Sequence, residues 1–355
     1  MSQITAELAS DPIFAILLHS APPVISPAQA ADLVHLHWGL RANADALACE
    51  RDASFRLQTP QGRSYVLKIA NPAESATQTD LQIQALLWLE RQAPDLRVPQ
   101  MVAARDGTHE VAVPLPDGRI GRARVLTWVP GVPLAQCGRG AGAAAQIGDL
   151  LARLGLGLRD FRHQAAAHDI LWDIRHAARL LPLIEALPDT PLRDGFLAEL
   201  DHFEARVLPY LRGLRWQVVH NDMNHHNLLV DPADPMQLTG VLDFGDMVQT
   251  PLIVDVAVAA SYLIHGAENP LMPVLELLRA YHRRVPLRRS EVFVLRDLIV
   301  ARLMTSVVIG QTRARLYPQN ATYILRNQAA AHDGLARFAA LPAQAVTETF
   351  LHALR

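Results

Sequence analysis

Residues 218–230 read VVHNDMNHHNLLV, and this stretch decides the fold. Two short apolar runs, 218–219 and 228–230, bracket a loop whose side chains are almost all polar. Apolar runs of this length are typical of short buried strands, and a polar loop held between such strands is a common place for functional groups. The stretch therefore predicts a rigid frame that presents the residues of its loop.

Asp222 and Asn227 lie within this loop at the H-x-D-x-x-x-x-N spacing at which kinases place a catalytic carboxylate and a metal-binding amide. An Asp-Phe-Gly tripeptide at 243–245 follows the strand-like segment 238–242, and a carboxylate at the end of a buried strand is costly unless it binds a cation. In phosphoryl transfer a hard divalent ion neutralises phosphate oxygens while a carboxylate accepts the hydroxyl proton. We therefore predict Asp222 as the base, and Asn227 and Asp243 as Mg²⁺ ligands.

Lys68 supplies a third element of the same pattern. It stands near the end of the strand-like run 65–69 (YVLKI), from which a lysine can reach the α- and β-phosphates of a nucleotide. Each element alone arises by chance, whereas the order lysine, catalytic loop, Asp-Phe-Gly is specific. The pattern predicts a phosphoryl donor that is a nucleoside triphosphate, either ATP or GTP.

The hydrophobic periodicity changes about a third of the way along the chain. Before that point the pattern predicts a hairpin of 54–58 and 64–69, one helix with apolar residues at 81, 85, 86 and 89, and a strand at 119–129. Beyond Pro130 it predicts helices at 141–160, 193–212, 268–283, 291–316 and 320–340, and short strands at 216–220, 227–230 and 238–242.

These elements predict an α+β fold of two lobes. The first, 1–129, is a strand-rich nucleotide-binding lobe with a helical extension over about 1–40. The second, 130–355, is a helical lobe that carries the catalytic loop and the acceptor site.

Composition narrows the class of protein. The chain has 355 residues, half of them apolar, and a formal charge of −2, so neither a nucleic acid nor an anionic membrane is an expected partner. Cys49 and Cys137 have no metal-site or disulfide spacing. The longest apolar stretch, 251–264, is interrupted by Asp255 and is shorter than the ~20 residues of a membrane span. We expect a cytoplasmic protein, of open oligomeric state.

Five further segments carry a family resemblance: APP at 21–23, ERDASF at 50–55, YVLKIANP at 65–72, TWVPG at 127–131 and LDFGDMV at 242–248. On these segments the chain resembles the aminoglycoside phosphotransferase and choline kinase superfamily, and most closely hydroxylysine kinase and its bacterial relatives. The resemblance implies a protein-kinase-like bilobal fold with the site between the lobes. It also implies that residues 50–56 form a loop over the phosphates, and that Thr127 and Val129 offer backbone groups to the purine.

The same resemblance implies a small acceptor with a hydroxyl group and an amine. An amino alcohol or hydroxy amino acid comes first, led by 5-hydroxylysine, and aminoglycosides and choline- or ethanolamine-type alcohols come second. Trp172 and Asp173 stand where the family places acceptor-binding residues. Asp246 and Asp173 are acids that suit an ammonium group.

Two residues depart from the family pattern. Asn221 stands where aminoglycoside phosphotransferases usually have glycine, although choline kinases resemble this chain in having asparagine there, and this departure does not affect the expected catalysis. Gln82 stands where the family often has a glutamate that pairs with the strand lysine. Glu74 or Glu90 are candidates to replace it, or the phosphates alone position Lys68. The departure at Gln82 leaves a nucleotide-binding pseudokinase as an alternative to an active enzyme.

Other polar residues keep further alternatives open. His220, His225 and His226 suggest a metal-dependent hydrolase, but adjacent side chains of an extended chain point to opposite sides, and His220 suits a structural role better. We expect Asp255 to brace the catalytic loop through backbone hydrogen bonds. Arg302 is either a clamp for a substrate carboxylate or one half of an internal ion pair.

Overall fold

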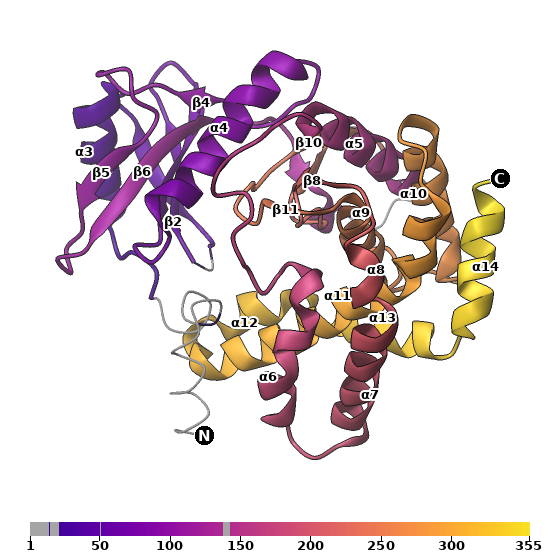
Figure 1. Ribbon diagram of the computed structural model, residues 1–355. Helices are drawn as coiled ribbons and strands as arrows, with labels where there is room; N and C mark the ends of the chain where they lie inside the picture. The colour runs from indigo at the N-terminus through magenta and orange to yellow at the C-terminus, as the bar shows by residue number, and fades with distance from the viewer. Residues whose placement is uncertain (1–13, 15–20, 50, 138–142) are drawn as a thin grey trace. The chain divides into compact units, whose positions relative to one another are not determined.

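The computed structural model describes residue 14 and residues 21–49, 51–137 and 143–355. The chain divides into two compact units (Figure 1). The described residues of the N-terminal unit fall within Phe14–Val129 and His163–Ala165, and those of the C-terminal unit fall within Pro130–Arg162 and Ala166–Arg355. The division falls next to the Pro130-Gly131 turn.

An antiparallel sheet organises the N-terminal unit. Its strands are β1 (Asn43–Leu47), β2 (Ala53–Gln58), β3 (Ser64–Ala70), β4 (Met101–Val102), β5 (Val111–Pro114) and β6 (Ile120–Thr127). They pair in the order β1-β2-β3-β6-β4, and β5 also pairs with β6. The predicted hairpin is confirmed, because β2 and β3 pair from Gln58↔Ser64 to Ala53↔Ile69.

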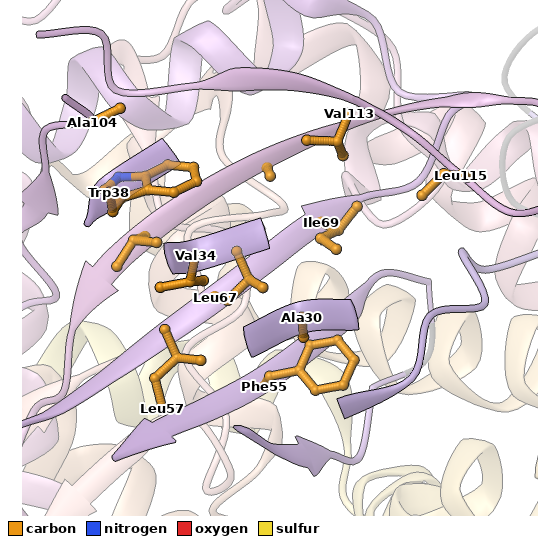
Figure 2. Packing of buried hydrophobic residues seen from close by; sticks show 12 residues of the cluster. Ala30, Val34, Trp38, Phe55, Leu57, Leu67, Ile69, Ala104, Val113 and Leu115 are labelled. Carbon is orange, nitrogen blue, oxygen red and sulfur yellow. The ribbon is translucent and has the colours of Figure 1, made fainter. Parts of the chain in front are cut away.

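Helix α3 (Pro27–Trp38) covers part of this sheet. A capping box at Ser26 begins it and a left-handed Gly39 ends it. Its buried residues Ala30, Val34 and Trp38 pack with side chains of the sheet strands (Figure 2). The helix falls within the expected extension over 1–40, of which residues 1–13 and 15–20 lie outside the described residues.

Helix α4 (Ala76–Gln92) is the single helix predicted between the strands. A capping box at Ser75 begins it. Its buried face includes all four apolar positions that the periodicity selected: Leu81, Ala85, Leu86 and Leu89.

Ten α-helices form most of the described part of the C-terminal unit: α5 (Ala143–Leu158), α6 (Leu181–Glu185), α7 (Pro191–Arg206), α8 (Leu208–Leu211), α9 (Leu252–Ser261), α10 (Leu271–Arg284), α11 (Arg289–Leu316), α12 (Ala321–Ile324), α13 (Gln328–Ala339) and α14 (Ala343–Ala353). The 28-residue α11 packs against α7, α9, α13 and α14. It has buried residues along its whole length, because neighbours cover it on several sides.

Two small sheets hold the loops of interest in this unit. Strands β8 (Trp216–Val219) and β11 (Val248–Pro251) pair with each other. Strand β9 (Leu228–Val230) pairs with both β10 (Leu238–Val241) and β7 (Val132–Pro133). The loop 220–227 therefore joins β8 to β9, and the segment 242–247 joins β10 to β11.

Two predicted helices differ in detail from the structure. The segment 193–212 contains two helices, α7 and α8, because Pro209 has no backbone N–H with which to continue the first. The segment 320–340 is interrupted by a 3₁₀ turn at Leu325–Asn327 between α12 and α13. Among the described residues, no helix is both long and apolar enough to cross a membrane.

Candidate active site

The loop after β8 turns sharply at Asn221, whose φ of 63° lies in the left-handed region. Asp255 of α9 accepts hydrogen bonds from the amides of His220, at 3.4 Å, and Asn221, at 2.8 Å. His220 contributes its ring, with Nε2 3.0 Å from the carbonyl oxygen of Leu242 and Nδ1 accepting from the amide of Asp222 at 3.2 Å. The expected bracing by Asp255 and the structural role of His220 are both confirmed.

The carboxylate of Asp222 is held at both oxygens. Oδ2 accepts from the side-chain amides of Asn227, at 2.8 Å, and Asn224, at 2.9 Å, whereas Oδ1 accepts from Nη2 of Arg302 at 3.1 Å. Burial is the main effect that raises the pKa of Asp222, the nearby carboxylate of Asp246 adds to it and Arg302 opposes both, and together they bring the pKa to about 6. The predicted base is therefore a fixed and largely buried carboxylate.

Asn227 and Asp243, the predicted metal ligands, belong to two segments joined by a hydrogen bond from the amide of Leu242 to the carbonyl of Asn227 at 2.8 Å. Asn227 directs its Nδ2 at Asp222, which leaves its amide oxygen as the atom suited to a cation. Asp243 has an exposed side chain and a left-handed backbone with φ of 57°. An amide oxygen and a carboxylate are hard donors, so this pair fits Mg²⁺.

Arg302 of α11 forms an internal ion pair with Asp222, one of its two predicted roles. The residue is 1% exposed. Its Nη1 donates to the carbonyl of Trp172 at 3.1 Å and its Nη2 donates to the hydroxyl of Tyr262 at 3.0 Å. The guanidinium carbon lies 5.0 Å from the ring centroid of Trp172 and 5.8 Å from that of Tyr262. Cation and rings form one cluster beside the predicted base.

The three residues predicted for the acceptor have different surroundings. Trp172 is half-buried against Arg302, and Asp246 is buried close enough to raise the pKa of Asp222. Asp173 is fully buried, with Oδ2 2.7 Å from Nε of Arg175 and Oδ1 accepting from the Thr250 hydroxyl at 3.0 Å. The structure therefore places Trp172 against Arg302, the partner of Asp222, and Asp246 within electrostatic reach of Asp222. It directs the carboxylate of Asp173 toward Arg175 and Thr250.

The sequence did not predict a role for Asn224 or Tyr262, which contact the residues described above. Asn224 donates to Asp222 and also accepts from the amide of His226 at 2.8 Å, so it orders the loop. The sequence does carry a signal for Asn224, because a second asparagine three residues before Asn227 offers the same side-chain amide. Tyr262 directly follows α9 and no motif marks it.

The histidines of the loop have separate surroundings. The ring of His220 lies 5.0 Å from that of Phe244, and the ring of His225 lies 6.3 Å from that of Tyr262. Within the described ranges, no group of three or more His, Cys, Asp or Glu residues is arranged to hold a metal ion. The geometry gives the hydrolase alternative no support.

Lys68, in the N-terminal unit, has Asp52 as an ion-pair partner, with Nζ 3.8 Å from Oδ2. Asp52 is itself anchored, because its Oδ1 accepts from the backbone amide of Asn71 at 3.1 Å. Asp52 belongs to the segment 50–56 that was expected to cover the phosphates, of which Glu50 lies outside the described residues. A loop carboxylate thus contacts the strand lysine.

The contacts of Gln82 are hydrogen bonds to Arg124 and Glu74, and not the ion pair with Lys68 that a glutamate at this position would form. It accepts a hydrogen bond from Arg124 and donates one to Glu74 at 2.6 Å. Burial, with a further contribution from Asp52, raises the pKa of Glu74 to about 7. Arg124 lies directly opposite Lys68 in the β3–β6 pair, so the two cations are cross-strand neighbours. Glu74 is therefore part of this charge cluster.

Thr127 and Val129, the predicted purine-binding residues, lie at and just beyond the end of β6. The amide of Thr127 donates to the carbonyl of Gln100 at 2.9 Å, and its Oγ1 accepts from the amide of Gln100 at 2.9 Å. The carbonyl oxygen of Thr127 is therefore the group that would contact a purine. Val129 is buried.

A fixed carboxylate, two oxygen donors on neighbouring segments and a strand lysine are the groups that kinase-like phosphotransferases use. Comparison with known proteins identifies the same class. Residues 47–292 match the model of the phosphotransferase enzyme family, and the chain belongs to that family. It is a phosphotransferase that acts on hydroxyl groups.

Two relatives and one solved structure illustrate the similarity. The chain is 26% identical over 328 residues to hydroxylysine kinase of Mus musculus, covering 86% of this chain and 87% of the relative. It is 30% identical over 247 residues to homoserine kinase of Cupriavidus necator, covering 68% and 71%. A solved complex of amicoumacin kinase with AMP-PNP and Ca²⁺ superposes with a TM-score of 0.67 at 16% identity, covering 92% of this chain and 94% of that one. This last similarity confirms the kinase-like α+β fold.

Proposed function

We propose that this small-molecule kinase transfers the γ-phosphate of ATP or GTP to the hydroxyl of an amino alcohol or hydroxy amino acid, with 5-hydroxylysine as the first candidate. The observation that carries the proposal is the carboxylate of Asp222, which Asn224, Asn227 and Arg302 hold at both oxygens. A carboxylate fixed in this way suits the orientation of a hydroxyl nucleophile.

In the proposed reaction the acceptor oxygen forms a bond to the γ-phosphorus while the bond to the leaving nucleoside diphosphate breaks. Asp222 orients the hydroxyl and accepts its proton. Asn227 and Asp243 would hold Mg²⁺, which supplies neutralising charge for the phosphate oxygens. No covalent enzyme intermediate is needed.

The N-terminal unit supplies the proposed nucleotide contacts. Lys68 holds the α- and β-phosphates, and its contact with Asp52 limits the positions that the ammonium group takes. The carbonyl of Thr127 and the amide of Val129 contact the purine. The amicoumacin kinase complex supports a nucleotide donor and a divalent cation, since both were bound there.

The choice of acceptor rests on charge and on the relatives. Asp246 is a buried acid beside Asp222 and suits an ammonium group of the substrate. Asp173 is the weaker candidate, because its carboxylate is engaged by Arg175 and Thr250. Hydroxylysine and homoserine, after which the two relatives are named, are both hydroxy amino acids. Trp172 offers an apolar wall for such a substrate.

An assay of nucleoside diphosphate release tests this proposal, with ATP and GTP supplied separately. The acceptor panel contains hydroxylysine, homoserine, ethanolamine, choline and an aminoglycoside. We expect turnover with a hydroxy amino acid, retained in Asp201→Asn, an exposed aspartate of α7, and abolished in Asp222→Asn. Turnover with choline or an aminoglycoside alone would favour the second group of acceptors. Equal turnover in wild type and Asp222→Asn would refute the role of Asp222.

A further inference from the structure

Arg302 is one of the residues that hold the carboxylate of Asp222 in place. It heads the fully buried side chains by volume among the described residues. Burying a cation costs several kcal/mol unless it is paired and hydrogen-bonded. Arg302 meets that requirement through Asp222, Tyr262 and the carbonyl of Trp172.

The stabilising value of such a pair is small, because a buried ion pair is often no better for stability than apolar side chains of similar volume. The effect of the pair on the position of the Asp222 carboxylate is larger than its effect on stability. Arg302 leaves its own Nε buried and without a hydrogen-bond partner in the described structure, which is a further cost. This arrangement suits orientation of the carboxylate better than stabilisation of the fold.

The donors to Asp222 arrive from two directions. Asn224 and Asn227 both belong to the loop and both bind Oδ2. The carboxylate rotates about its Cβ–Cγ bond, and donors at Oδ2 restrain that rotation from one side. Arg302 belongs to α11, and it binds Oδ1. Among the described side chains it therefore restrains the plane of the carboxylate from the other side, and it ties that plane to α11.

We propose that Arg302 is a positioning residue for the phosphoryl transfer, which fixes Oδ1 of Asp222 and thereby the orientation of the carboxylate toward the acceptor hydroxyl. This inference rests on the proposed function. Tyr262 and Trp172 hold the guanidinium in turn, through the Tyr262 hydroxyl and the Trp172 carbonyl. A planar fork can serve these acceptors together, whereas a lysine ammonium on a flexible stem cannot reproduce the arrangement.

Arg296 provides a matched control on the same helix. It is also buried, at 7% exposure, and its Nη1 lies 2.9 Å from Asp297 and 3.7 Å from Glu199. Replacing it removes a buried arginine from α11 without touching the contacts of Asp222. A loss of rate that is specific to Arg302 therefore separates orientation of the base from damage to the helix.

The experiment measures kcat, and KM for the nucleotide and for the best acceptor of the panel, in wild type, Arg302→Ala, Arg302→Lys and Arg296→Ala. We expect kcat of Arg302→Ala to fall about 100-fold with little change in the KM for nucleotide, as a misoriented catalytic group predicts. We also expect Arg302→Lys to recover only part of the loss, Arg296→Ala to stay near wild type, and added guanidine to accelerate Arg302→Ala.

Three results would overturn the inference: a kcat within about threefold of wild type in Arg302→Ala, an equal loss in Arg296→Ala, or a slow Arg302→Ala enzyme that guanidine does not accelerate. If Arg302→Ala does not fold, Arg302→Lys decides the question by the same threefold limit. Absence of turnover in the wild type would instead count against the proposed function.

A second experiment does not depend on turnover, so failure of this inference stays distinguishable from failure of the proposed function. The urea midpoints of Asp222→Asn, Arg302→Met and the double variant are compared with wild type. We expect the double variant to be less destabilised than the sum of the single variants, because the first change already removes the pairing. Simple additivity would show that the two residues do not act on each other, and would contradict the inference.

Discussion

Oδ1 of Asp255 accepts a hydrogen bond at 2.8 Å from the backbone amide of Asn221, a residue 34 positions earlier in the chain. The other oxygen of Asp255 accepts from the amide of His220. Helix α9 therefore carries the acceptor for two successive amides just before the predicted base. The position of the loop depends on this helix as well as on its own strands.

Replacing Asp255 with alanine should loosen the loop. Two buried amide donors would lose their acceptor, and each such loss costs about 1–3 kcal/mol, so we expect the free energy of unfolding to fall by about 2–6 kcal/mol. The turnover rate of the folded fraction should fall as well. Urea denaturation measures the first effect, with Asp201→Ala as the exposed control. A loss of under about 1 kcal/mol would show that the two hydrogen bonds do not hold the loop.

The left-handed backbone of Asn221 predicts a preference for glycine over alanine at this position. Both substitutions remove the side-chain amide, whose two polar atoms are buried without hydrogen-bond partners in the described structure. They differ only by a Cβ at a φ of 63°. We expect Asn221→Gly to be more stable than Asn221→Ala by about 1 kcal/mol in thermal or urea unfolding. Equal stabilities would mean that the turn does not keep this conformation in solution.

Two glycines in helices should respond to alanine in opposite directions. A Cβ at Gly148 of α5 would overlap the backbone carbonyl of Leu277 in α10, whereas a Cβ at Gly195 of α7 would meet no atom within 4 Å. We expect Gly148→Ala to lower the free energy of unfolding by at least about 2 kcal/mol, because two backbones must separate. Gly195→Ala should raise it by about 0.5–1 kcal/mol through helix propensity.

The contrast between these two variants is the test of the α5–α10 contact. Urea denaturation of both, under one set of conditions, measures it. A Gly148→Ala protein as stable as wild type would show that the two helices are not in contact at Leu277.

Asp333 predicts a particular acid sensitivity. A hydrogen bond from His265, with help from Arg337 and the amide of Gly266, lowers the pKa of Asp333 to about 2. Since the ionised form is favoured in the folded state, the contribution of Asp333 to stability is complete above pH ~4 and is lost as the pH falls toward 2. We expect Asp333→Asn to be less stable than wild type at neutral pH, and the difference to shrink as the pH falls through this window.

Unfolding midpoints of wild type and Asp333→Asn at a series of pH values test this prediction. Asp201→Asn, which changes an exposed aspartate, is the control for the general effect of removing a charge. A difference that does not depend on pH between 2 and 4 would contradict the assigned cause of the shift.

Much of the fold follows from local patterns. The alternation in 54–58 and 64–69 predicts the β2–β3 hairpin, and the helical spacing of Leu81, Ala85, Leu86 and Leu89 predicts the buried face of α4. The H-x-D-x-x-x-x-N spacing predicts that Asp222 and Asn227 come together, and their side chains are hydrogen-bonded at 2.8 Å. In these cases one segment carries both the signal and the contact.

Contacts between distant segments are not visible in such patterns. Arg302 reaches Asp222 from α11, and its surroundings come from Trp172 and Tyr262, so no short window of sequence contains the cluster. Short strands such as β7 and β11 were missed for a similar reason, because pairing with β9 and β8 defines them more than their own propensity does.

The most direct test of the account follows the γ-phosphate itself. Wild type and Asp222→Asn are incubated with hydroxylysine, Mg²⁺ and nucleotide labelled at the γ-phosphate, and label in the acceptor is measured over time. The account predicts label on the hydroxyl oxygen of the acceptor, formed at least about 100-fold more slowly by Asp222→Asn. Label released only as inorganic phosphate, or transferred equally fast by both proteins, would contradict it.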